Sequence, residues 1–171
     1  MFYIELIDEH MEDESKKISK ADESSKLFIM DMLGSEHTHG IDIDSIYFIK
    51  EKKWLMFEFL KSDKKDPFDC GPNLYPWNWK KFVTLFEISK RLDAYLWLVN
   101  YSLEDAWKNN IKLQKVSKID YDLLKKALNS YGGYLKGYLP YVISTDTTMD
   151  LVAFKKLFND INNSAIMSVD L

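Results

Sequence analysis

The sequence predicts an α/β domain, and three features lead to this expectation. Residues 11–33 carry the apolar spacing of a helix, and residues 40–61 read as two apolar strands joined by a charged turn. A helix that begins near Trp79 then leads directly into an apolar run at residues 94–101. A helix placed between two buried strands is typical of a crossover within one sheet. We therefore expect helices that pack on a central mixed sheet.

Composition favours one globular domain in the cytoplasm. The 171 residues are 46% apolar and 15% aromatic, enough for a core over about residues 11–118 and a helical, tyrosine-rich extension over about 119–171. A net charge of -4 weakens the case for a nucleic-acid ligand without excluding a local basic patch. With Cys70 as the sole cysteine, neither an intrachain disulfide nor a cysteine-based zinc site is expected. No signal peptide or membrane-spanning run is recognised, so no membrane partner is expected.

The N-terminal third is expected to be mainly helical. Residues 2–7 fit a short strand or the start of a helix, and residues 35–40 fit a loop or a poor strand. Between them, residues 11–33 form a stripe with helical spacing, and Gly34 is a plausible stop. The stripe consists of Met11, Glu14, Ile18, Ala21, Ser25, Phe28 and Met32.

The hairpin of residues 40–61 combines apolar strands with carboxylates. Side chains alternate along a strand, so Asp42 and Asp44 share one face, and Glu58 shares a face with its apolar neighbours Met56 and Leu60. Folding about the turn at residues 50–53 puts Asp44 roughly opposite Glu58. Both strands look buried on both sides, and a buried carboxylate is costly unless it is paired or bound to a metal.

The remaining elements follow from local signals. Residues 62–78 read as a long loop, with Asn78 as the N-cap of the helix that follows. Residues 111–118 alternate like an outer strand, and residues 121–130 look helical. Residues 148–162 read as an amphipathic helix capped by Thr147 or Thr148.

Two facing carboxylates with a nearby lysine suit Mg²⁺ and phosphate chemistry, because Mg²⁺ favours hard oxygen ligands and keeps waters. The order helix, hairpin, helix, strand, with Gly40-Ile41-Asp42-Ile43-Asp44-Ser45-Ile46 followed by Phe57-Glu58-Phe59-Leu60-Lys61, resembles the PD-(D/E)xK nuclease superfamily. It is loosely similar to the small Holliday-junction-resolvase-like members. The resemblance implies a restriction-endonuclease-like core, with a helix, a central mixed sheet and a crossover helix, and additional C-terminal helices.

The same resemblance assigns roles to residues. It implies Asp44 and Glu58 as ligands of Mg²⁺ (or Mn²⁺), with Glu14 or Asp42 completing the metal site and Glu23 as a runner-up to Glu14. It implies Lys61 as the lysine that assists the attacking water. In this superfamily the lysine sometimes migrates to a neighbouring helix, which makes Lys80 and Lys81 the alternatives.

Three features depart from the superfamily pattern. Lys61 follows Glu58 by three residues and not two, so it falls on the opposite strand face unless a β-bulge re-aims it. The proline of the motif is absent, and the strand expected before Asp42 is barely visible in residues 35–40. The sequence therefore supports two functions. The first is a metal-dependent endonuclease that hydrolyses DNA phosphodiester bonds; the second is a catalytically inactive binding or regulatory protein, such as an accessory or inhibitor in a defence system or mobile element.

Three further groups were weighed for ligand binding. Tyr75, Trp77, Lys80 and Lys81 mix aromatic faces with cations at a helix start, which suits branched or single-stranded DNA, although the aromatic residues could equally fold back as a lid on the core. His37 and His39 could begin a transition-metal site or be exposed loop residues. The segment 131–143, rich in tyrosine and glycine, fits either a contact surface for a protein partner or homodimer, or ordinary β-structure.

Overall fold

The computed structural model describes residues 31–32, 41–49, 53–72, 78–130 and 140–165. The chain divides into two compact units, Met1–Gly40 and Ile41–Leu171, and the strands and helices described below all belong to the second. Of the helix predicted over residues 11–33, Asp31 and Met32 fall within the described residues, and both are helical.

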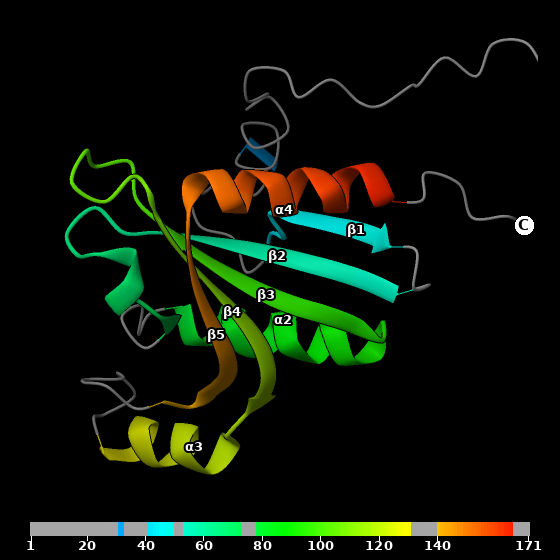
Figure 1. The fold of residues 1–171 in the computed structure, drawn as a ribbon. Helices are drawn as coiled ribbons and strands as arrows, with labels where there is room; N and C mark the ends of the chain where they lie inside the picture. Colours follow the sequence, from blue (N-terminus) through cyan, green and yellow to red (C-terminus); the bar gives the residue numbers. More distant parts are fainter. Residues whose placement is uncertain (1–30, 33–40, 50–52, 73–77, 131–139, 166–171) are drawn as a thin grey trace, which may run out of the picture. The chain divides into compact units, whose positions relative to one another are not determined.

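The second unit contains a five-stranded mixed sheet in the order β1-β2-β3-β4-β5, which confirms the α/β class (Figure 1). Strands β1 and β2 form the predicted antiparallel hairpin, and β3 lies parallel to β2. Strands β4 and β5 extend the sheet in antiparallel fashion. The strand bounds are Ser45–Ile49, Lys53–Lys61, Ala94–Tyr101, Asn110–Ile119 and Val142–Asp150.

Three α-helices of the described residues pack on this sheet: α2 (Trp79–Arg91), α3 (Tyr121–Ser130) and α4 (Leu151–Ser164). A 3-10 turn, η1 (Pro67–Asp69), lies in the loop after β2. Helix α2 is the predicted crossover between β2 and β3. Asn78 precedes it as predicted, but its side chain makes no capping hydrogen bond.

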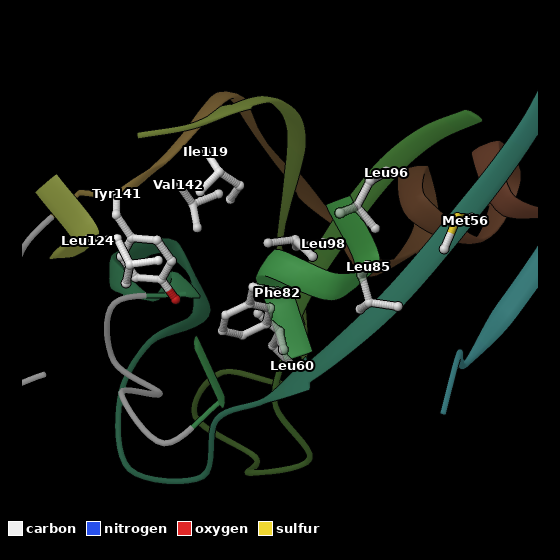
Figure 2. Packing of buried hydrophobic residues seen from close by; sticks show 10 residues of the cluster. All are labelled: Met56, Leu60, Phe82, Leu85, Leu96, Leu98, Ile119, Leu124, Tyr141 and Val142. Atoms are coloured by element: carbon white, nitrogen blue, oxygen red, sulfur yellow. The ribbon is translucent and has the colours of Figure 1, made fainter. Parts of the chain in front are cut away.

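Helix α2 packs on one face of the sheet. Its residues Phe82 and Leu85 are buried against Met56 and Leu60 of β2, and against leucines of β3. Figure 2 shows this core, with Met56, Leu85 and Leu96 at one end and a group from β4, α3 and the start of β5 at the other. That group is Ile119, Leu124, Tyr141 and Val142.

Helix α4 covers the opposite face. Phe57 of β2 and Val99 of β3 point to this side, because they alternate with the residues that face α2. They pack against Phe154 and Ile161 of α4. The sheet is therefore enclosed between α2 and α3 on one face and α4 on the other (Figure 1).

Burial on both faces, predicted for both hairpin strands, holds for β2 and not for β1. Four consecutive residues of β2, from Leu55 to Glu58, are buried. Strand β1 pairs with β2 and with no other strand of the described residues. It is half-buried, and Ile46 is 42% exposed. Asp42 and Asp44 lie just before β1 and not within it.

Strand β5 was not predicted. Residues 148–150, expected to begin the last helix, are the end of this strand, and Asp150 caps α4 by accepting a hydrogen bond from the Ala153 N–H at 2.7 Å. The prediction of Thr147 or Thr148 as the cap is therefore wrong. The polar run from Ser144 to Asp146 hides the strand, because β5 is paired on one side and largely exposed. The strand predicted at residues 111–118 is confirmed as β4. It is not the outer strand, because β5 pairs with the side of β4 that is away from β3.

None of the described helices is both long enough and apolar enough to cross a membrane.

Candidate functional site

Glu58 is a buried carboxylate in the middle of β2. Its side chain points to the α2 face, between the buried Met56 and Leu60, and the residue is only 4% exposed. Oε1 accepts a hydrogen bond and ion pair from the Lys81 Nζ at 2.7 Å. Oε2 is also buried, and no residue that the structure describes donates a hydrogen bond to it. Half of the carboxylate is therefore satisfied and half is not.

Lys81 reaches Glu58 from the first turn of α2. The neighbouring Phe82 anchors this turn in the core, which directs the half-buried Lys81 side chain along the sheet surface. Its Nζ also lies 3.0 Å from Oδ1 of Asp42, whose side chain is 84% exposed. Lys81 thus links a buried carboxylate to one at the surface.

Asp44 lies across the hairpin from Glu58. The pairing of Ser45 with Phe57, extended by one residue, puts Asp44 opposite Glu58, as predicted. Oδ2 of Asp44 accepts a hydrogen bond from the Phe59 N–H at 2.7 Å. This bond to the residue that follows Glu58 fixes the Asp44 carboxylate beside it.

The surroundings of Glu58 oppose its negative charge. Burial raises the pKa of its carboxyl to about 7; the Lys81 hydrogen bond lowers it, and the nearby charge of Asp44 and, more weakly, of Asp42 raises it. Burial opposes the charge of Lys81 as well. Its bonds to Glu58 and Asp42 outweigh that effect and raise the pKa of the ammonium above its ordinary value.

The structure does not bring Lys61, the predicted catalytic lysine, to Glu58. Strand β2 pairs with β3 in an unbroken register through Lys61 and Tyr101, so no bulge re-aims the Lys61 side chain. It lies on the face opposite Glu58, and its Nζ pairs with Asp63 at 2.8 Å. Lys81, an alternative suggested by the resemblance, is the lysine that contacts Glu58.

Of the other predicted site residues, Lys80 lies within the described part of the chain. Lys80 is exposed beside Lys81, and its Nζ lies 5.7 Å from the ring centroid of Trp79. Glu14, Glu23, Tyr75, Trp77, His37 and His39 lie outside the described residues.

Asp44 and Glu58 suit a small hard cation. Within the described ranges, no three or more acidic, histidine or cysteine side chains gather closely enough to form an all-protein metal cage. Mg²⁺ does not require one, because it usually binds one or two carboxylates and completes its shell with waters and substrate phosphates. The unpartnered Oε2 of Glu58 is the kind of buried oxygen that such an ion would satisfy. The donor set therefore fits Mg²⁺ or Mn²⁺.

A second buried polar group on the same sheet face was missed in the sequence. Asn100 of β3 is fully buried, and its Nδ2 donates to Oε1 of Gln114 on β4 at 2.9 Å. The available signal was a lone amide at the end of the apolar run of residues 94–99. Nothing in the sequence alone indicated its partner.

Comparisons of this chain with protein-family models, with curated proteins and with solved structures find no match. They therefore assign it to no family.

Proposed function

We propose that this protein is a metal-dependent nuclease that hydrolyses DNA phosphodiester bonds, and that its sheet is the core of a restriction-endonuclease-like fold. One observation carries this proposal: the buried carboxylate of Glu58 has one oxygen on Lys81 at 2.7 Å and the other without a donor from the described residues. A carboxylate kept buried with its pKa raised to about 7 is typical of a functional site.

Each side chain around Glu58 would have its own role in this reaction. Glu58 and Asp44 would hold Mg²⁺ or Mn²⁺, which when bound would activate a water and offset phosphate charge. Lys81 has three N–H donors, and Glu58 and Asp42 take two of them. Among the described residues, the third is left to orient a water or a phosphate oxygen. The exposed Asp42 would hold the Lys81 ammonium in place.

The order of elements supports the fold assignment. An antiparallel hairpin, a crossover helix and a parallel strand follow one another as in the superfamily that the sequence resembles. The position of Lys81 on the crossover helix matches the migrated lysine found in some of its members. Similarity of fold alone does not establish chemistry, so the proposed function rests on the side chains of Glu58, Asp44 and Lys81.

One observation favours the second function, a catalytically inactive binding or regulatory protein. Lys81 pairs with both Glu58 and Asp42, as it would in a purely structural ion-pair network. The displacement of Lys61 adds little support to this second function, because Lys81 contacts Glu58 in its place.

Cleavage assays distinguish the two functions. The protein is incubated with linear, nicked and branched DNA and with Mg²⁺ or Mn²⁺, beside Glu58→Ala. We expect cleavage of at least one substrate, loss of cleavage in EDTA and loss in the variant. Cleavage that survives Glu58→Ala would rule out this site. Absence of cleavage on every substrate would favour the binding protein.

A further inference from the structure

Asn100 lies close to Glu58 on the same face of the sheet. It follows Leu96 and Leu98 at two-residue spacing, so it faces α2, and it pairs with Leu60 of β2. Glu58 precedes Leu60 by two residues and shares its face. Strand spacing puts the Cα atoms of Glu58 and Asn100 about 8 Å apart, within reach of their side chains through one water.

The orientation of the Asn100 amide is fixed from the far side of the sheet. Asp146 of β5 accepts hydrogen bonds from Nε2 of Gln114, 3.1 Å from each carboxylate oxygen. A carboxylate only accepts, so Gln114 must turn its NH₂ toward Asp146 and its carbonyl toward Asn100. Asn100 must then donate from Nδ2 to Gln114, at 2.9 Å.

The remaining atom, Oδ1 of Asn100, therefore points away from β4. It is buried, and none of the described residues donates to it. Asp146 and Gln114, at the far end of this chain of hydrogen bonds from Glu58, are held in place by their neighbours. Lys112 bonds to Asp146 at 3.0 Å and to the Cys70 carbonyl at 2.9 Å. Gly71 lies so close to Gln114 that an added Cβ would be 3.4 Å from its Oε1.

Two buried acceptors thus lie on adjacent strands without a donor from the described residues: Oδ1 of Asn100 and Oε2 of Glu58. Each of them needs a donor or a cation, and neither can satisfy the other while Glu58 is ionised. A divalent cation with its water shell meets both demands, because the ion binds the carboxylate and its waters only donate.

We propose that Asn100 is a positioning residue of the metal site, whose Oδ1 accepts a hydrogen bond from a water on the ion held by Glu58 and Asp44. This inference rests on the proposed metal site but not on DNA cleavage. Asp146 and Gln114 take part at a distance, by setting which end of the Asn100 amide faces Glu58.

Mn²⁺ affinity without DNA tests this role, measured by titration with electron paramagnetic resonance detection of free Mn²⁺. Asn100→Leu removes the acceptor, and we expect about tenfold weaker binding or more, as for other residues that orient metal-bound groups. Asn100→Asp loses the donor to Gln114 but keeps an acceptor on the Glu58 side, so it should bind Mn²⁺ more tightly than Asn100→Leu does. The matched control is Asn110→Leu, which removes two amide hydrogen bonds to Asp66 elsewhere on β4 and should bind Mn²⁺ as the wild type does.

The outcomes separate the two proposals. If the wild type binds Mn²⁺ and Asn100→Leu binds it equally well, the role of Asn100 is wrong while the metal site stands. Equal affinities of the Leu and Asp variants would also overturn it. If the wild type binds no Mn²⁺, both proposals fail. Should Asn100→Leu not fold, Gln114→Met decides, since it frees the Asn100 amide to turn: weaker binding supports the role and unchanged binding refutes it.

Discussion

Glu58 is the residue at which stability and the proposed function oppose each other. The fold buries its carboxylate between apolar neighbours, leaves Oε2 without a donor from the described residues, and places two other acids nearby. One lysine only partly offsets these effects, because the pKa of Glu58 still stands near 7. A residue kept in such a position is more easily explained by a ligand than by the fold.

The first prediction concerns Glu58→Gln. The folded carboxyl holds its proton up to about pH 7, whereas the unfolded one releases it near 4.5, so ionisation of Glu58 removes stability as the pH rises through this interval. The shift corresponds to about 3 kcal/mol at most. Without metal, we expect the variant to be more stable than the wild type at pH 8, by up to that amount, and little different at pH 5.

Urea unfolding at the two pH values measures this difference. A stability change that is the same at pH 5 and pH 8 would show that the Glu58 carboxyl is not shifted. The same variant should lose Mn²⁺ binding, so that a gain in stability accompanies a loss of function.

The second prediction separates the three lysines. Lys81→Met should lower the rate of DNA cleavage by about 100-fold or more, the usual range for a positioned group that assists proton transfer. Lys61→Met should cleave nearly as the wild type does, because Lys61 lies on the other face and pairs with Asp63. Lys80→Met should affect DNA affinity more than rate. Equal losses in Lys61→Met and Lys81→Met would contradict this assignment.

Among the elements, α2 and α4 have different tasks. Helix α2 supplies Lys81 to the site and Phe82 to the core from adjacent positions. Helix α4 closes the other face through Phe154 and Ile161 and is remote from Glu58. A substitution that weakens α4 should therefore lower the stability of the protein without changing the contacts of Glu58.

Asp150→Ala tests that separation. Loss of the N-cap hydrogen bond to the Ala153 N–H should destabilise the protein by about 1 kcal/mol. Mn²⁺ affinity should stay within twofold of the wild type. The unfolding midpoint in urea and the Mn²⁺ titration give the two values. A large loss of affinity would mean that α4 contributes to the site.

Elements with a clear apolar period were predictable from the sequence. The predicted strand at residues 94–101 is β3, and the predicted helix after Trp79 is α2, because the burial of apolar side chains alone determines both elements. Strand β5 was not predictable, since an exposed edge strand has no apolar period to detect and takes its shape from pairing with β4.

The site was predictable only where local pairing sets it. Asp44 lies opposite Glu58 because the pairing of β1 with β2, two strands close together in the sequence, sets their register. The lysine that contacts Glu58 was harder to predict. Lys61 ends a strand and Lys81 lies on a helix, and the spacing of residues does not show which of the two reaches Glu58. Asn100 depends on Gln114 and Asp146, which lie on two strands further along the chain, so its role could not be read from its neighbours.

At the scale of the whole second unit, the proposed metal binding would compete with protonation for one carboxylate. Because the pKa of Glu58 is about 7, a larger fraction of its carboxyl is ionised, and so able to bind a cation, at pH 8 than at pH 6. We expect Mn²⁺ to raise the melting temperature more at pH 8 than at pH 6, and to have little effect on Glu58→Gln at either pH. Thermal unfolding with and without Mn²⁺ measures this, and an equal rise at both pH values would contradict it.

Strand β5 also affects how the protein behaves at high concentration. No strand of the described residues pairs with its outer edge, which belongs to a run of serine, threonine and aspartate. Asp146 points toward the sheet face where Gln114 and Lys112 hold it. A strand from another molecule that added there would find few apolar partners and would have to cover a charge. Such edges discourage the growth of one sheet into the next. The polar residues that hid this strand from prediction thus protect the protein against aggregation along that border.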